Sequence, residues 1–174
     1  RIIYQNLMSS LPKFVATIEY DGLPTDDTVN NLILNSNIFS YEYILAILNS
    51  KVSAFYLKYY ISNNSELTVH LDYSYTGKCL VPKIGREEND IIELVDGLYR
   101  KKYNNIDEVK RIIDYKIYNI FEFDENEIAI IESSVRWGDE LEFKIQVLNG
   151  FKMYFDQIIS VFKNRYDCEE KIDI

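Results

Sequence analysis

The sequence is poor in the residues that build most catalytic and cofactor-binding motifs. Its 174 residues include 1 histidine, 2 cysteines, 6 glycines and 3 prolines. There is no GxGxxG or Walker A loop, and Gly150 stands alone, which excludes the common dinucleotide and P-loop sites. Cys79 and Cys168 lie far apart, without the close spacing of zinc ligands. We therefore predict a chain with no catalytic centre, cofactor site or metal site of its own.

The few other chemistry-bearing residues fit structural roles better than catalysis. His70 lies on a predicted strand, and no serine or cysteine nucleophile motif lies near it. The loop carboxylates Asp26-Asp27 and Glu87-Glu88 have the chemistry to bind Mg²⁺, but acidic pairs in loops are more often simply solvated. We interpret all of these residues as non-catalytic.

No apolar run approaches the roughly 20 residues that cross a bilayer. The opening RIIYQNL has none of the features of a signal peptide, and the two distant cysteines fit a reducing compartment. We expect a cytoplasmic protein without a membrane segment, and the start at Arg1 rather than Met indicates a fragment of a longer chain.

Negative charge is concentrated in the second half. The chain carries a net charge of −9, which opposes binding to a polyanion such as DNA. Residues 40–86, however, contain five basic and three acidic side chains, a net +2, whereas residues 91–174 contain 12 basic and 18 acidic ones, a net −6. A basic middle segment in an acidic chain is compatible with a nucleic-acid-binding face.

Hydrophobic spacing predicts an α+β fold: a small mixed sheet with one long helix, followed by a helical part. Alternation predicts the first strands at 2–7, 14–20 and 28–34, and Ser40 is a predicted N-cap for a single helix over 41–59. Further strands are predicted at 67–73 and 79–84. Helices are predicted at 91–102, from 106 to about 121, at 125–133 behind an Asp124/Glu127 capping box, and over 151–166. We divide the chain into an α/β core (1–86), a helical part of the same domain (87–133) and a helical extension of uncertain role (134–174).

The segment YILAILNSKVSAFYLKYY at 43–60 resembles the conserved helix, with its Asn-Ser-Lys step, of the TaqI-like C-terminal specificity domain. That domain occurs in type IIG restriction–modification enzymes and related adenine methyltransferases. Other segments follow in the family's order: RIIYQNL (1–7), FVATIEYDGLPTDDTV (14–29), KCLVPKI (78–84), IIELVDGLYRKK (91–102) and IDYKIYNIFEFDENEIAIIES (113–133). The KCLVPKI segment has one proline where the family has two, and residues 134–174 lie outside the resemblance.

The resemblance implies a target-recognition domain that reads double-stranded DNA for a methyltransferase domain elsewhere in the parent chain. S-adenosylmethionine, and Mg²⁺ if the parent also cleaves, would then bind outside this chain. The catalytic domain would flip the target adenine, while the specificity domain reads base edges in the major groove.

Candidate DNA-contacting residues are cations, loop amides and tyrosines of the middle segment. They are Lys51, Lys58, Asn63, Asn64, Tyr73, Tyr75, Lys78, Lys83 and Arg86. Each also has a structural explanation: solvated charge for the lysines and arginine, a turn for the asparagines, and packing for the tyrosines. We interpret Asn49 as a residue that fixes a helix contact. Two other functions remain open, a protein-interaction or scaffold domain with an acidic helical face, and the recognition domain of a type I specificity subunit.

Overall fold

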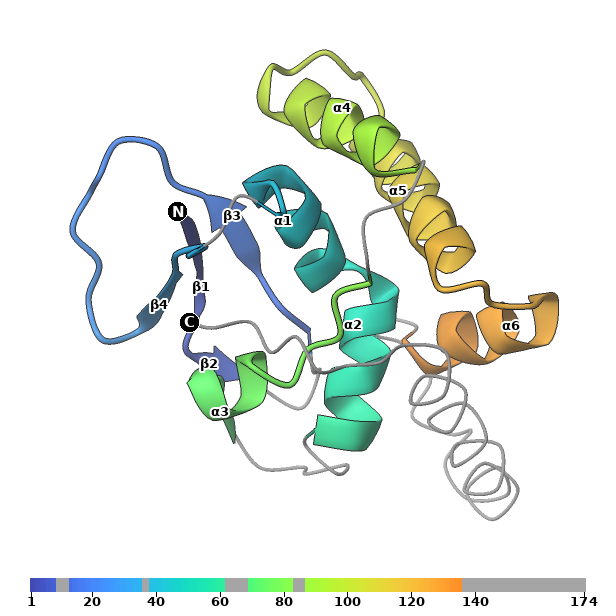
Figure 1. The fold of residues 1–174 in the computed structure, drawn as a ribbon, viewed down its shortest axis with the longest axis horizontal. Coiled ribbons are helices and arrows are strands. Elements are labelled where there is room, and N and C mark those ends of the chain that lie inside the picture. The colour runs from blue at the N-terminus through green and yellow to red at the C-terminus, as the bar shows by residue number, and fades with distance from the viewer. Residues whose placement is uncertain (9–12, 36–37, 62–68, 83–86, 136–174) are drawn as a thin grey trace.

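In the computed structural model, the described residues are 1–8, 13–35, 38–61, 69–82 and 87–135. They form a small sheet on one side and a layer of helices on the other (Figure 1). The predicted helix at 151–166 lies outside the described residues. The predicted α+β class is confirmed.

The sheet is built around the first strand of the chain. Strand β1 (Ile2–Gln5) lies between β3 (Ala16–Ile18) and β4 (Val29–Leu32), and it is antiparallel to both. Alternation turns Ile2 and Tyr4 inward, where both are buried. A second, two-stranded sheet pairs β2 (Leu7–Met8) with β5 (Val69–His70), also antiparallel. The three predicted strands of the first 34 residues are thereby confirmed, with shorter bounds.

The predicted single helix at 41–59 is wrong. The structure has α1 (Tyr41–Asn49), α2 (Lys51–Tyr56) and the π-helical turn η1 (Leu57–Ile61). Ser40 caps α1 as predicted, accepting a hydrogen bond from the Tyr43 backbone N–H at 3.1 Å. The interruption lies at Ser50, whose extended backbone (φ −73°, ψ 159°) ends α1, while its hydroxyl accepts from the Ser53 backbone N–H and so begins α2.

The strand predicted at 67–73 is reduced to β5 in the described residues. Tyr73 instead begins the short helix α3 (Tyr73–Thr76), because the Asp72 carboxylate accepts the Ser74 N–H and caps it. The strand predicted at 79–84 is wrong over 79–82, which contain no strand, and residues 83–84 lie outside the described part.

Three helices complete the described chain: α4 (Glu88–Tyr99), α5 (Ile106–Ile120) and α6 (Glu125–Ser134). Helices α4 and α5 form a hairpin at one end of the molecule, and α6 follows at the side (Figure 1). Helix α4 begins three residues before the predicted position. One cluster of buried side chains joins residues of the sheet, of α1 and α2 and of α4 to α6. The α/β and helical parts therefore share a core.

The predicted capping box of α6 is confirmed. The Asp124 carboxylate accepts from the Glu127 N–H at 2.9 Å, and the Glu127 carboxylate accepts from the Asp124 N–H at 2.8 Å. Because both bonds satisfy otherwise unpaired donors, Asp124→Ala is expected to lower the free energy of unfolding by about 1 kcal/mol. Thermal unfolding should show a Tm lower by about 2–4 °C. The control is Asn126→Ala, an exposed change in the same turn, and an equal loss in both variants would contradict the capping role.

Candidate nucleic-acid interface

The segment from β5 to Lys78 is held against the sheet by polar contacts to β1, to β4 and to Asn6, which follows β1. The Leu71 N–H donates to the Asn6 carbonyl at 2.6 Å, and the Asn30 side chain donates to the Leu71 carbonyl at 2.5 Å. Thr76, which is fully buried, donates from its hydroxyl to the Tyr4 hydroxyl at 3.0 Å. The surface side chains of this segment therefore stand on a fixed backbone, as recognition residues on a scaffold require.

Helix α3 and the turn that follows it present an aromatic residue and a cation. Tyr73 is 74% exposed, and Lys78 is exposed with its ammonium group 5.7 Å from the centroid of the half-buried Tyr75 ring. Between them, Gly77 lies so close to the helix that an added Cβ would be 2.9 Å from the Tyr73 carbonyl oxygen. A side chain there would have to displace backbone, so glycine fixes the turn that positions Lys78.

The negatively charged side chain of Asp72 lies directly before Tyr73, at the start of α3. Its carboxylate accepts from the Ser74 hydroxyl at 2.5 Å and from the Ser74 N–H at 2.8 Å. The hydroxyl bond is the main reason that the pKa of Asp72 lies below its ordinary value. The carboxylate is thus ionised at neutral pH and caps α3.

Two of the predicted lysines lie instead on the helical side. The Lys51 ammonium group is 2.6 Å from the Glu132 carboxylate of α6, and the Lys51 backbone N–H donates to Asp114 of α5 at 3.0 Å. The Lys58 ammonium group donates to the Ser134 carbonyl at 3.2 Å and lies 4.7 Å from the centroid of the Tyr59 ring. Both ammonium groups therefore make contacts within the protein.

The structure thus brings together Tyr73, Tyr75 and Lys78 and places Lys51 and Lys58 apart from them. The remaining predicted residues, Asn63, Asn64, Lys83 and Arg86, lie outside the described part of the chain. Sequence reasoning missed Asp114 and Glu132 as partners of Lys51, because they follow it by 63 and 81 positions.

The Asn-Ser-Lys step is the joint between the sheet and the helices. The Asn49 side chain accepts from the Ala16 N–H at 3.0 Å and donates to the Ala16 carbonyl at 2.9 Å. Ser50 separates the two helices, and Lys51 is bound by carboxylates of α5 and α6. The interpretation of Asn49 as a residue that fixes a helix contact is confirmed, and its partner is the backbone of β3.

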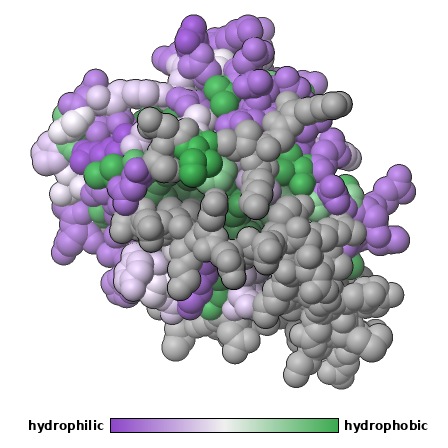
Figure 2. Space-filling view, in the orientation of Figure 1, coloured by the Kyte–Doolittle hydropathy of each residue, from purple (hydrophilic) through white to green (hydrophobic). Residues whose placement is uncertain are grey.

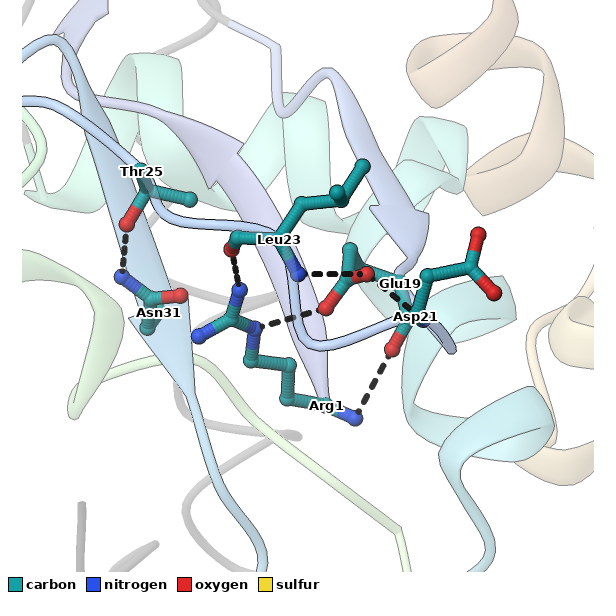
Figure 3. A network of polar contacts seen from close by, with 6 residues as sticks. All are labelled: Arg1, Glu19, Asp21, Leu23, Thr25 and Asn31. Carbon is teal, nitrogen blue, oxygen red and sulfur yellow. Dashed lines mark hydrogen bonds and ion pairs between the residues drawn. The ribbon is translucent and has the colours of Figure 1, made fainter.

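The loop between β3 and β4 is ordered by one carboxylate (Figure 3). Glu19 accepts from the Asp21 N–H at 2.7 Å, the Leu23 N–H at 3.1 Å and the Arg1 guanidinium at 3.0 Å. The same guanidinium donates to the Leu23 carbonyl. The backbone bond from Leu23 is the main reason that the pKa of Glu19 is lowered. Gly22 has a φ of 69°, a left-handed conformation that glycine adopts without strain, and so allows the loop to turn there. Arg1 therefore acts here as a loop-fixing residue.

The cysteine of the described residues, Cys79, is free and buried. Burial raises the pKa of the Cys79 thiol to about 12, so at neutral pH it remains protonated and is a poor nucleophile. Within the described ranges no group of three or more His, Cys, Asp or Glu side chains is arranged to hold a metal ion. No described helix combines the length and apolar character needed to cross a membrane.

Residues 1–79 match the family model of the TaqI-like C-terminal specificity domain. The predicted resemblance is confirmed over this range. The matched range runs from β1 through Cys79, so it includes the Asn-Ser-Lys joint, α3 and Lys78. The match supports DNA recognition in a restriction–modification system and is consistent with a chain that carries no catalytic centre. No curated protein and no solved structure matches the chain.

Proposed function

We propose that this chain reads duplex DNA for a catalytic domain that lies elsewhere in the parent protein. The observation that carries the proposal is the specificity-domain match over residues 1–79. The exposed Tyr73 and Lys78 on the anchored α3 segment supply the chemistry, a hydroxyl-bearing aromatic ring and a cation for contacts to phosphate, sugar or base edges. Lys83, Arg86, Asn63 and Asn64 lie outside the described residues and stay candidates for DNA contact by their side-chain chemistry.

The proposed parent is a type IIG restriction–modification enzyme or an adenine-specific DNA methyltransferase. Such an enzyme would use S-adenosylmethionine, and Mg²⁺ if it also cleaves, in a domain that flips the target adenine. A cofactor loop and an Asn-Pro-Pro-Tyr tetrapeptide elsewhere in the parent would support this assignment. A second recognition half in place of those motifs would support a type I specificity subunit instead.

Charge reversal at Lys78 tests the DNA-contacting surface. Lys78→Glu in the full chain is expected to lower duplex affinity. The slope of log affinity against log salt should also become smaller by about 0.9 or more, because each phosphate contact that is lost means that fewer counterions are released from the DNA on binding. Tyr73→Ala should lower affinity by roughly 3- to 10-fold through loss of one hydrogen bond. Fluorescence anisotropy with a labelled duplex measures both effects.

The matched control for Tyr73→Ala is Tyr115→Ala, since Tyr115 is a tyrosine of α5 that is 61% exposed. Wild-type affinity in this control, with losses in the α3 variants, is the expected pattern. Absence of wild-type duplex binding at low salt would reject DNA recognition and favour the protein-interaction alternative. Wild-type binding that neither α3 variant changes would move the contact surface away from α3.

A further inference from the structure

The turn between α4 and α5 is basic within the acidic half of the chain. Arg100, Lys101 and Lys102 follow α4 directly, Lys110 and Arg111 lie on α5, and all five are exposed. Residues 96–111 contain five basic and three acidic side chains, whereas residues 91–174 as a whole contain 12 and 18. Averaging over the acidic half conceals this local excess of positive charge.

Most of these cations are not neutralised by neighbouring carboxylates. Among the described residues, the salt bridges engage Arg1, Lys51, Arg100 and Lys116. None of these five salt bridges involves Lys101, Lys102, Lys110 or Arg111. A cation without a carboxylate partner keeps its full capacity to neutralise a phosphate and release counterions. Among the described residues, the hairpin therefore gathers four cations that take no part in these salt bridges.

Lys101 also occupies a backbone position that favours glycine. Its φ is 51°, in the left-handed region, and its N–H donates to the Leu98 carbonyl while the Lys102 N–H donates to the Gly97 carbonyl. These two bonds are those of a Schellman helix end, where the left-handed residue is most often glycine. The turn is packed tightly, since a Cβ on Gly97 would be 2.5 Å from the Tyr103 ring. The lysine thus occupies this position at a cost in stability relative to glycine.

Helix α5 ends in the same way with the opposite charge. Glu122 has a φ of 54°, and its N–H and that of Phe123 donate to the Asn119 and Tyr118 carbonyls. This backbone turn therefore does not itself require a lysine. A cation at the end of α4 does interact favourably with the helix dipole, which is the structural explanation for Lys101 and the one that an experiment has to exclude.

We infer that the α4–α5 turn is a second DNA-contacting surface, which binds phosphates of the duplex whose sequence the specificity domain reads. The inference rests on the proposed function. The turn lies at the opposite end of the view from α3 (Figure 1), and the surface at that end is largely hydrophilic (Figure 2). Phosphate contacts remote from the reading surface fix the orientation of a protein on DNA without selecting sequence. Losing them lowers affinity about equally for every duplex sequence.

Lys101→Gly distinguishes a role in DNA contact from a role in stability. Glycine removes the cation, which should weaken DNA binding, and it also relieves the strain of the left-handed backbone, which should stabilise the fold. The variant of the full chain is expected to have a Tm higher by about 2–4 °C. Its slope of log duplex affinity against log salt should be smaller by about 0.9, measured by anisotropy between about 0.05 and 0.2 M salt. Glu122→Gly is the matched control, with an unchanged salt slope and a larger rise in Tm, because it also removes an anion from the end of a helix.

Three results would overturn the inference. A wild-type slope in Lys101→Gly, with wild-type duplex binding intact, leaves the proposed function standing and assigns the turn to structure alone. A lower Tm in Lys101→Gly, with unchanged affinity, shows that the lysine serves the helix end. No wild-type binding to any duplex at low salt rejects the proposed function and this contact together.

Discussion

Replacing Tyr118 with alanine is expected to lower the free energy of unfolding by about 3–5 kcal/mol, the range for removal of a large buried aromatic side chain. Tyr118 is fully buried on α5, and its ring packs near Tyr115 and Phe123. Its hydroxyl donates to the Glu132 carboxylate at 2.8 Å, so the ring also connects α5 to α6. Urea denaturation followed by circular dichroism measures the loss.

Two further variants show how much of the stability lost in Tyr118→Ala comes from burial of the ring and how much from the hydrogen bond. Tyr115→Ala changes the same residue type on the same helix at a position that is 61% exposed, and it should cost no more than about 0.5 kcal/mol. Tyr118→Phe keeps the ring and removes the bond to Glu132, at a cost of about 0.5–1.5 kcal/mol. Equal losses for Tyr118→Ala and Tyr115→Ala would contradict the burial that the structure assigns to Tyr118.

Asp114 is expected to make the stability of the protein rise as pH falls from about 7 towards 4. It is 8% exposed, and burial raises its pKa from 3.8 to about 6, against the opposing effects of the Lys51 N–H and the Lys51 charge. The charge of Glu132 raises the pKa further. Between the two pKa values the folded state binds more protons than the unfolded state, so this group stabilises the fold increasingly on acidification.

Asp114→Asn removes this titration and retains an oxygen that can accept from Lys51. The variant should exceed wild-type stability at pH 7 by up to about 3 kcal/mol, the value of a two-unit pKa shift, and the difference should disappear near pH 4. Asp114→Ala, which leaves the Lys51 N–H without this acceptor, should be about 1–3 kcal/mol less stable than Asp114→Asn. Urea midpoints across this pH range test both expectations. A difference between Asp114→Asn and wild type that stays constant with pH would refute the raised pKa.

Features encoded within a few residues could be predicted from the sequence. The spacing of Asp124 and Glu127 is enough to specify a capping box, and Ser40 before an apolar stripe is enough to specify a helix start. The strands around β1 were predictable because alternation directly reflects one buried face. In each of these cases the determining contacts lie close together along the chain.

The break at Ser50 was not predictable from periodicity, because Leu48 and Val52 keep helical spacing across it. Its cause is partly tertiary: Asn49 pairs with β3, and Lys51 is bound by carboxylates of α5 and α6. Such partners lie 33 to 81 positions away and leave no trace in the local pattern. For the same reason Lys51 could not be distinguished in the sequence from a lysine that faces solvent.

The local structure of the candidate surface was predicted wrongly. Alternation around Tyr73 resembles a strand, yet the Asp72 cap begins a helix there and leaves Tyr73 exposed beside Lys78. The Asp72-Tyr73-Ser74 sequence, in which an aspartate can cap a helix, was the feature that could have predicted this start. The exposed cations at 100–102 were hidden for a different reason, because charge was counted over a window much longer than one turn.

The polar contacts of Asn49 and Tyr99 also close the outer edge of the sheet. Strand β3 is an edge strand, and its outward Ala16 N–H and carbonyl are both bound by the Asn49 side chain. The Ile18 N–H donates to the Tyr99 hydroxyl at 2.8 Å. An exposed edge with open donors and acceptors invites strand addition from another molecule and hence aggregation. Two side chains from the helical layer fill those positions, so β3 is protected from becoming a template for intermolecular sheet growth.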